Sequence, residues 1–246
     1  ISHGPLMVCG FLGTLIGLER AVALGDRRAY AAPLFAAAGA VAAVAGPPSP
    51  LAPALITLGS IGLLAIYAAV LRRQAALFTI VMALGGAMWL AGNAFWVSGW
   101  SINRFVFWWA GFLVLTIAGE RLELNRLLQP SPLARASFIV AVGMLVAGVA
   151  MTTRNPGAGV RVAGVGLIAL SLWRARNDVA RRTVSQAGLP RFIAVCLLAG
   201  YTWLAVSGAL AATAREWMSG PRYDAALHAL FLGFVFSMIF AHAPII

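Results

Sequence analysis

Apolar runs of about twenty residues follow one another along almost the whole chain, and short stretches with arginine, proline or glycine separate them. A helix needs about 20 consecutive apolar residues to cross the hydrocarbon core of a bilayer. The pattern therefore predicts an all-α, polytopic integral membrane protein with about nine transmembrane helices, within a range of eight to ten. The predicted spans are 3–24, 29–46, 53–71, 77–98, 103–120, 134–152, 159–175, 190–213 and 222–246.

Composition supports the same class of protein. Hydrophobic residues make up 61% of the 246 positions and charged residues 10%, whereas soluble domains carry roughly 25% charged residues. The spans and their short connections use nearly the whole chain, so we expect a single transmembrane helical domain over 1–246. The chain opens with Ile1 and ends on "HAPII", and we expect that its true termini are missing.

The net charge of +11 comes from 18 arginines without a lysine. These arginines lie in short connections beside apolar runs, so the positive-inside rule explains them and no nucleic-acid partner is expected. With nine spans, most arginines fall on one side, which we predict to face the cytoplasm of a bacterium across its inner membrane. That side holds Arg20, Arg27, Arg28, Arg72, Arg73, Arg121, Arg126, Arg135, Arg174, Arg176, Arg181, Arg182 and Arg191. The other side holds Arg104, Arg154, Arg161, Arg215 and Arg222.

Two further patterns agree with this orientation. Five tryptophans are predicted to form an aromatic belt at the outer interface: Trp96, Trp100, Trp108, Trp109 and Trp217. The segments "LIGLERAVAL" and "TIAGERLEL" each place a Glu-Arg pair at a predicted cytoplasmic helix end. These pairs are either interfacial ion pairs or the remnant of an internal repeat, as many transporters have.

The chain has three histidines, and all of them lie in or beside predicted spans. Ionisable groups inside a span are rare and usually functional. His3 and His228 both lie near the outer start of a span, at comparable depth. They could be the two axial ligands of a b-type haem, or simply polar residues at helix ends. Met7 shares the helix face of His3, and histidine with methionine can also bind copper.

Residues near these two histidines could complete a haem site. Small residues in 10–13 and 233–236 would leave a slot for the porphyrin. Arg222 is one of three arginines near the outer face that could pair with the propionates. Tyr201 and Trp203 lie in the middle of a span, where their polar atoms need partners. A cofactor or a neighbouring carbonyl would supply them.

His242 lies 14 residues beyond His228, which is about 21 Å along a helix and nearly a whole number of turns. The two side chains should point roughly the same way but belong to different sites. His242 is level with Glu19 and Glu120 at the predicted cytoplasmic end. Three interpretations stay open: a metal site, a proton entry point, or an ion-pair network in which the carboxylates bind the arginines beside them.

Three segments carry a resemblance to a known family. "SHGPLMVCGFLGTLIG" resembles the His-x-x-x-Met-x-x-Gly-Phe first motif of the NnrS family of haem- and copper-containing membrane proteins. "GYTWLAVSG" and "HALFLGFVFSMIFAH" resemble that family's Gly-Tyr-x-Trp-Leu span and the histidine helix after it. The first motif is also similar to the low-spin haem histidine helix of haem–copper oxidase subunit I. The resemblance implies that His3 and His228 bind haem, that Tyr201 and Trp203 line the site, and that the protein acts in nitric oxide metabolism or tolerance.

The chain also departs from that family. NnrS proteins are longer and begin with a His-x-His-like motif where this chain has Ser2-His3. The arginine-containing stretch after their late histidine helix is replaced here by "FAHAPII". A haem–copper centre needs a dense histidine cluster, which this sequence lacks, so oxygen reduction by the oxidase mechanism is not expected.

The sequence therefore predicts a haem b-binding protein in the bacterial inner membrane, acting in electron transfer or nitrogen-oxide metabolism. If it is an enzyme, it is a haem-dependent oxidoreductase. Its expected partners are the lipid bilayer and other membrane or redox subunits. One alternative is a proton-coupled transporter of a small molecule or metal, with Glu19, Glu120 and His242 as coupling groups. Another is a non-catalytic membrane subunit of a respiratory complex.

Overall fold

The computed structural model describes residues 3–46, 50–124, 130–214 and 217–245, which are helical and contain no β-strand. Within these residues, nine helical segments are long and apolar enough to cross a membrane. The segments are His3–Leu24, Arg27–Ala45, Leu51–Arg73, Leu77–Val97, Ile102–Leu124, Pro132–Met151, Pro156–Asn177, Leu189–Ala212 and Pro221–His242. The predicted all-α fold and its nine helices are confirmed, with ends within a few residues of those expected. Arg126 and Arg215 lie outside the described residues.

Close contacts divide the chain into two compact units, 1–120 and 121–246, with the boundary inside α6. The prediction of a single domain stays a prediction. The first unit contains α1 (His3–Pro5), the π-helix η1 (Leu6–Leu12), α2 (Gly13–Leu24), the short 3₁₀ helix η2 (Arg27–Tyr30), α3 (Ala31–Ala45), α4 (Leu51–Arg73), α5 (Leu77–Val97) and most of α6 (Ile102–Leu124). In this unit α3 packs on α4, α4 packs on α5, and α2 contacts both α3 and α4.

Small residues bring the helices of the first unit close together. A Cβ added at Gly39 of α3 would lie 2.6 Å from Cγ1 of Ile56 in α4. A Cβ at Gly85 of α5 would lie 2.9 Å from the carbonyl oxygen of Phe112 in α6. Such close approach is typical of helices that pack within a membrane, where small residues let the backbones meet.

Buried aromatic residues fill the space between α5 and α6. Trp89 of α5 and Phe112 of α6 stack with ring centroids 4.8 Å apart, and Trp96 of α5 meets Trp109 of α6 edge-on at 5.5 Å. Trp109 and Trp217 were expected in an outer aromatic belt, but both are buried, with 0% and 4% of their surface exposed. The belt prediction is wrong for these two residues because their rings pack inside the protein.

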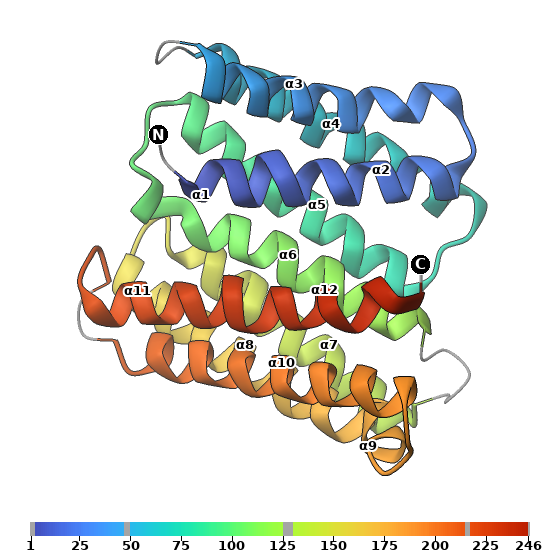
Figure 1. Ribbon diagram of the computed structural model, residues 1–246. Helices are drawn as coiled ribbons and strands as arrows, with labels where there is room; N and C mark the ends of the chain where they lie inside the picture. The colour runs from blue at the N-terminus through green and yellow to red at the C-terminus, as the bar shows by residue number, and fades with distance from the viewer. Residues whose placement is uncertain (1–2, 47–49, 125–129, 215–216, 246) are drawn as a thin grey trace. The chain divides into compact units, whose positions relative to one another are not determined.

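The second unit contains the end of α6 and the remaining helices. These are α7 (Pro132–Met151), α8 (Pro156–Asn177), the single turn α9 (Ala180–Thr183), α10 (Leu189–Ala212), α11 (Pro221–His228), the π-helix η4 (Ala229–Val235), α12 (Phe236–His242) and the 3₁₀ turn η5 (Ala243–Ile245). α8 packs against α7 on one side and α10 on the other. α10 also lies beside α11, η4 and α12, as Figure 1 shows.

Local sequence signals explain where α7 and α8 begin. The Ser131 hydroxyl accepts a hydrogen bond from the Ala134 N–H at 3.2 Å, and the Asn155 amide oxygen accepts one from the Ala158 N–H at 3.1 Å. A proline follows each of these caps, at a position where a missing N–H costs nothing. Both helix starts therefore follow from the side chain before the proline.

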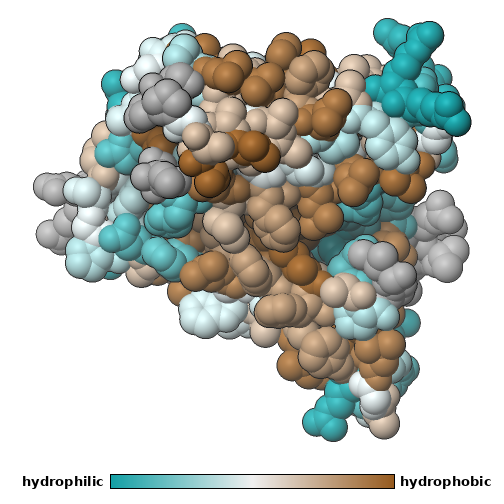
Figure 2. Space-filling view, turned by 45° about the horizontal axis from the view of Figure 1, so that its top comes forward, coloured by the Kyte–Doolittle hydropathy of each residue, from teal (hydrophilic) through white to brown (hydrophobic). Residues whose placement is uncertain are grey.

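Apolar side chains cover much of the surface of these helices. Leu34, Leu133 and Leu172 expose 66%, 80% and 63% of their surface. In the space-filling view, hydrophobic residues cover the middle of the visible face and hydrophilic residues gather at its margins (Figure 2). Exposed apolar surface of this extent indicates a hydrophobic environment outside the protein.

Gly148 and Gly143 of α7 form a matched pair for testing the helix packing. A Cβ at Gly148 would clash with the backbone of Ala163 in α8, whereas no described atom lies within 4 Å of one at Gly143. Gly148→Ala should therefore lower the free energy of unfolding by about 1–3 kcal/mol, as overpacking does. Gly143→Ala should leave it unchanged or raise it by up to about 1 kcal/mol. Thermal unfolding in detergent measures both, and equal effects would contradict the packing.

Candidate functional site

His228 closes α11 and has a defined hydrogen bond. Its Nδ1 lies 2.7 Å from the carbonyl oxygen of Asp224, one turn earlier. A carbonyl oxygen only accepts, so Nδ1 carries a proton, and in the neutral tautomer that this contact selects Nε2 has the lone pair. The side chain is exposed. Histidines that bind metals are commonly oriented in this way, with one ring nitrogen held by a carbonyl and the other free to coordinate.

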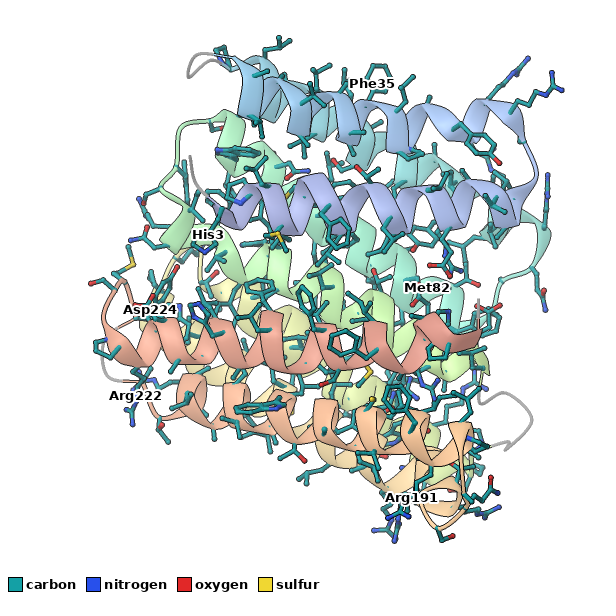
Figure 3. All side chains as sticks on the ribbon, in the orientation of Figure 1. His3, Phe35, Met82, Arg191, Arg222 and Asp224 are labelled. Carbon is teal, nitrogen blue, oxygen red and sulfur yellow. The ribbon has the colours of Figure 1, made fainter. Side chains whose placement is uncertain are left out.

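The helix ends around this residue are visible in Figure 3. Arg222 and Asp224 lie at the end of the second unit where α11 begins, and Arg191 lies at the opposite end, where α10 begins. The Arg222 guanidinium donates a hydrogen bond through Nη1 to the carbonyl of Thr213 at 2.9 Å. This contact connects the start of α11 to the residue that follows α10.

His3 and His228 both precede a π-helical segment. In the first unit, η1 begins three residues after His3, and in the second unit η4 begins directly after His228. π-Helical segments are rare and are frequently found at functional sites. The sequence contains no pattern that reveals them, although each segment includes a Gly-Phe pair. His3 is exposed, as His228 is.

The glycines predicted to leave a porphyrin slot are covered by protein atoms. A Cβ at Gly13 would lie 2.5 Å from Cζ2 of Trp89, and one at Gly233 would lie 2.5 Å from Cγ of Trp203. These glycines serve helix packing, so the slot prediction is wrong at these positions. Trp203 nevertheless lies against the histidine helix, with 47% of its surface exposed.

A small polar cluster lies inside the first unit, below His3. The Trp109 indole N–H donates to Oδ1 of Asn93 at 3.0 Å, and the Cys9 thiol donates to the same oxygen at 3.7 Å. All three side chains are completely buried. The cluster gives Asn93 of α5 and Cys9 of η1 a structural role in joining three helices. Met7, by contrast, is exposed.

Glu19, Arg20 and Glu120 form an ion-pair network in the first unit. Nη2 of Arg20 lies 2.8 Å from Oε1 of Glu19 and 3.1 Å from Oε1 of Glu120, joining the ends of α2 and α6. The ion-pair network, one of the three interpretations left open by the sequence, accounts for both carboxylates. His242 is half-buried at the end of α12 in the second unit. Among the residues that the structure describes, no group of three or more His, Cys, Asp and Glu side chains could hold a metal ion.

Asp178 is the centre of a second polar cluster, which lies in the second unit. Arg121 donates two hydrogen bonds through Nη2, at 3.1 Å to Oδ1 and 3.2 Å to Oδ2. The Tyr201 hydroxyl donates to Oδ2 at 2.7 Å, and the Ala180 N–H donates to Oδ1 at 3.0 Å. The polar atom of Tyr201 thus has a carboxylate partner rather than the carbonyl or cofactor that we expected, and Arg121 binds an aspartate far away in the sequence.

Asp178 was not among the predicted site residues, although the sequence around it carries one signal. In "RARNDVARR", an acidic residue stands among four arginines. Such an arrangement is typical of a charged, solvent-exposed connection between helices. Its fully buried carboxylate and its partners from two other helices become evident only in three dimensions.

Asp178 is ionised at neutral pH. Burial opposes the charge, but the Arg121 guanidinium and the hydrogen bonds from Tyr201 and Ala180 outweigh it, and they hold the pKa of the carboxyl below its usual value. A group whose pKa falls on folding contributes stability above its unfolded-state pKa, about 3.9 for aspartate. This contribution is lost as the pH drops through the lower, folded-state pKa.

A pocket of about 490 Å³ lies beside this cluster, and we name it the Arg174 pocket. The Arg174 side chain is 3% exposed, and its guanidinium lies 5.2 Å from the ring centre of Trp173 and 5.6 Å from that of Phe138. The described residues that line the pocket are Leu122, Pro130, Ser131, Trp173, Arg174, Arg176, Asn177, Asp178, Val179, Arg181 and Arg182.

Comparison with known families decides the classification of the chain. The family model described as "Domain of unknown function (DUF8744)" matches residues 1–246. The chain belongs to this family. No curated protein and no solved structure matches it. The function of this DUF8744 protein is therefore argued from its own residues.

Asp178 and Glu19 allow a buried and an exposed carboxylate to be compared by mutation. Asp178→Asn leaves Arg121 without its counter-charge, and breaking a buried pair in this way costs about 3–5 kcal/mol. Glu19→Gln removes a carboxylate whose side chain is 42% exposed, and such surface pairs contribute about 0–1 kcal/mol. Thermal unfolding in detergent at neutral pH should rank the two variants in this order.

The stability of Asp178→Asn relative to the wild type should also depend on pH. The stability difference between the wild type and Asp178→Asn should be constant above about pH 5 and should narrow as the pH falls below about 4, because Asp178 of the unfolded wild type then gains a proton while the folded protein still holds the carboxylate ionised. Unfolding measured over this pH range provides the check. A difference that does not change on acidification would show that the Asp178 carboxylate is not the group responsible.

Proposed function

We propose that this protein is a multi-pass membrane protein that binds b-type haem with His228 as an axial ligand. The nine long apolar helices support a place in the membrane. The uneven distribution of the arginines supports an orientation in which α2, α4 and α6 end at the cytoplasmic face of the bacterial inner membrane. His228 would then lie near the outer face.

The hydrogen bond of His228 is the observation that carries the proposal. The Asp224 carbonyl holds a proton on Nδ1, and His228 is exposed, so we assign Nε2 as the coordinating atom. Ionisable side chains inside an apolar span are rare and usually functional. The π-helical turn that follows directly is a further sign of function, because such turns are concentrated at functional sites.

Other residues contribute to the proposal to different degrees. The resemblance to the NnrS family implies that His3 also binds haem, and His3 is exposed before a π-helical segment. Trp203 lies on Gly233 of the histidine helix and is suited to cover one edge of a bound ring. Arg222 lies near the start of the same helix, where its charge could attract a propionate. Tyr201 is held by Asp178, so we propose for it only a role in positioning α10.

A bound haem would supply one-electron redox chemistry, and the chain would hold it and exclude water. Electron transfer or nitrogen-oxide metabolism is the function that follows, with other membrane or redox subunits as partners. If the protein is an enzyme, it is a haem-dependent oxidoreductase. A copper ion at His3 and Met7 would be an addition to this site. The transporter alternative is weakened, since Arg20 binds both Glu19 and Glu120.

His228→Ala should remove the haem, because it removes the coordinating Nε2. The measurement is the Soret absorbance per protein, oxidised and dithionite-reduced, after purification in detergent from cells with ample haem. The matched control is His242→Ala, which removes a half-buried histidine from the same span and should leave the spectrum unchanged.

Two results would overturn the haem proposal. One is a wild-type protein without a Soret band although haem was supplied. The other is a His228→Ala protein that keeps its full absorbance, which would dismiss His228 as a ligand. Circular dichroism of both variants separates loss of haem from loss of the helical fold.

A further inference from the structure

We propose that the Arg174 pocket binds a phosphate group. The group belongs either to the headgroup of an anionic phospholipid or to a soluble phosphate monoester. This proposal rests on the second unit alone and is independent of haem binding.

The walls carry an excess of positive charge. Four arginines are among the described residues that line the pocket, namely Arg174, Arg176, Arg181 and Arg182. The acidic residue among these lining residues is Asp178, and Arg121 already binds its carboxylate. Several guanidinium groups around one pocket repel each other unless an anion lies between them. The pocket is therefore complementary to a ligand with more than one negative charge.

Two of the four guanidinium groups, those of Arg174 and Arg181, have contacts that hold them in place before any ligand binds. The Arg174 guanidinium is fixed over two aromatic rings. The Trp173 indole N–H donates to the Ala134 carbonyl at 2.7 Å, which fixes one of these rings. Arg181 donates to the Arg176 carbonyl at 3.3 Å. A preorganised site loses less entropy on binding than one that must be assembled by the ligand.

The chemistry of the walls favours phosphate over carboxylate. A guanidinium presents a planar fork of N–H donors that matches phosphate geometry. A phosphate monoester carries close to two negative charges and three strong acceptor oxygens at neutral pH, so several arginines can bind it together. The Ser131 hydroxyl accepts from the Ala134 N–H and keeps its own O–H to donate. The volume of about 490 Å³ lies in the range of small-molecule sites.

The pocket lies at a level that two sources of phosphate can reach. It lies at the end of α8, beside the turn α9, on the arginine-rich side that we place at the cytoplasmic face. Phospholipid headgroups and soluble cytoplasmic phosphates both reach this level. The phosphate group is the feature they share.

Four probes separate these sources by isothermal titration calorimetry of the purified full chain in a neutral detergent. Sodium phosphate is compared with sodium chloride at equal ionic strength, and dioctanoyl phosphatidic acid with dioctanoyl phosphatidylcholine. The test variant is the double substitution Arg176→Gln, Arg182→Gln, in which both arginines are exposed and the fold should persist. The control is Arg72→Gln, Arg73→Gln, which removes the same charge from the exposed end of α4.

We expect phosphate or phosphatidic acid to bind, and the test variant to bind about tenfold more weakly or worse, because each charge-assisted hydrogen bond that is lost weakens binding severalfold. The control should bind like the wild type. Binding of sodium phosphate would indicate a soluble ligand, and binding of phosphatidic acid alone a lipid headgroup. The proposal fails if neither probe binds, if phosphatidylcholine binds equally well, or if the control loses as much affinity as the test variant.

Discussion

The buried carboxylate of Asp178 connects three helices of the second unit. It receives hydrogen bonds from Arg121 at the end of α6, from Tyr201 in the middle of α10, and from the N–H of Ala180 where α9 begins. Each of these donors would be costly to bury alone. Since Asp178 itself follows the last residue of α8, the contact fixes where that helix stops. Asp178 also lines the Arg174 pocket. The packing of these helices and the proposed binding of phosphate therefore depend on the same ionised carboxylate.

The rest of the packing is made by shape rather than by charge. Glycines let α3 meet α4, α5 meet α6, and α7 meet α8, with backbones close enough that an added methyl group would clash. Hydrophobic burial gives little net attraction between helices in lipid, so close van der Waals contact has to hold them together. The ion pairs of Arg20 and Arg121 at the helix ends add selectivity to this packing, since they determine which helix ends meet.

Much of the fold could be predicted from the sequence, because the length of an apolar run is a local property. The nine helices and their approximate ends follow from it. The contacts of the site could not be predicted in the same way. Arg121 and Asp178 are 57 residues apart, and the sequence does not show that α10 brings Tyr201 to the same carboxylate. The position of Trp109 was predicted wrongly for a related reason. Hydropathy does not show which side of a helix faces a neighbouring helix.

The π-helical segments have a consequence for the angular phase of the two histidine spans. A π turn contains more residues than an α turn, so each residue in η1 or η4 advances less around the helix axis. Residues before and after such a segment that the α-helical period would place on one face of the helix therefore point in different directions. His228 and His242 lie on opposite sides of η4, and their shared direction, expected from a regular helix, is lost. Deleting one residue from η4 would therefore change the angle between the directions of His228 and His242 around the helix axis.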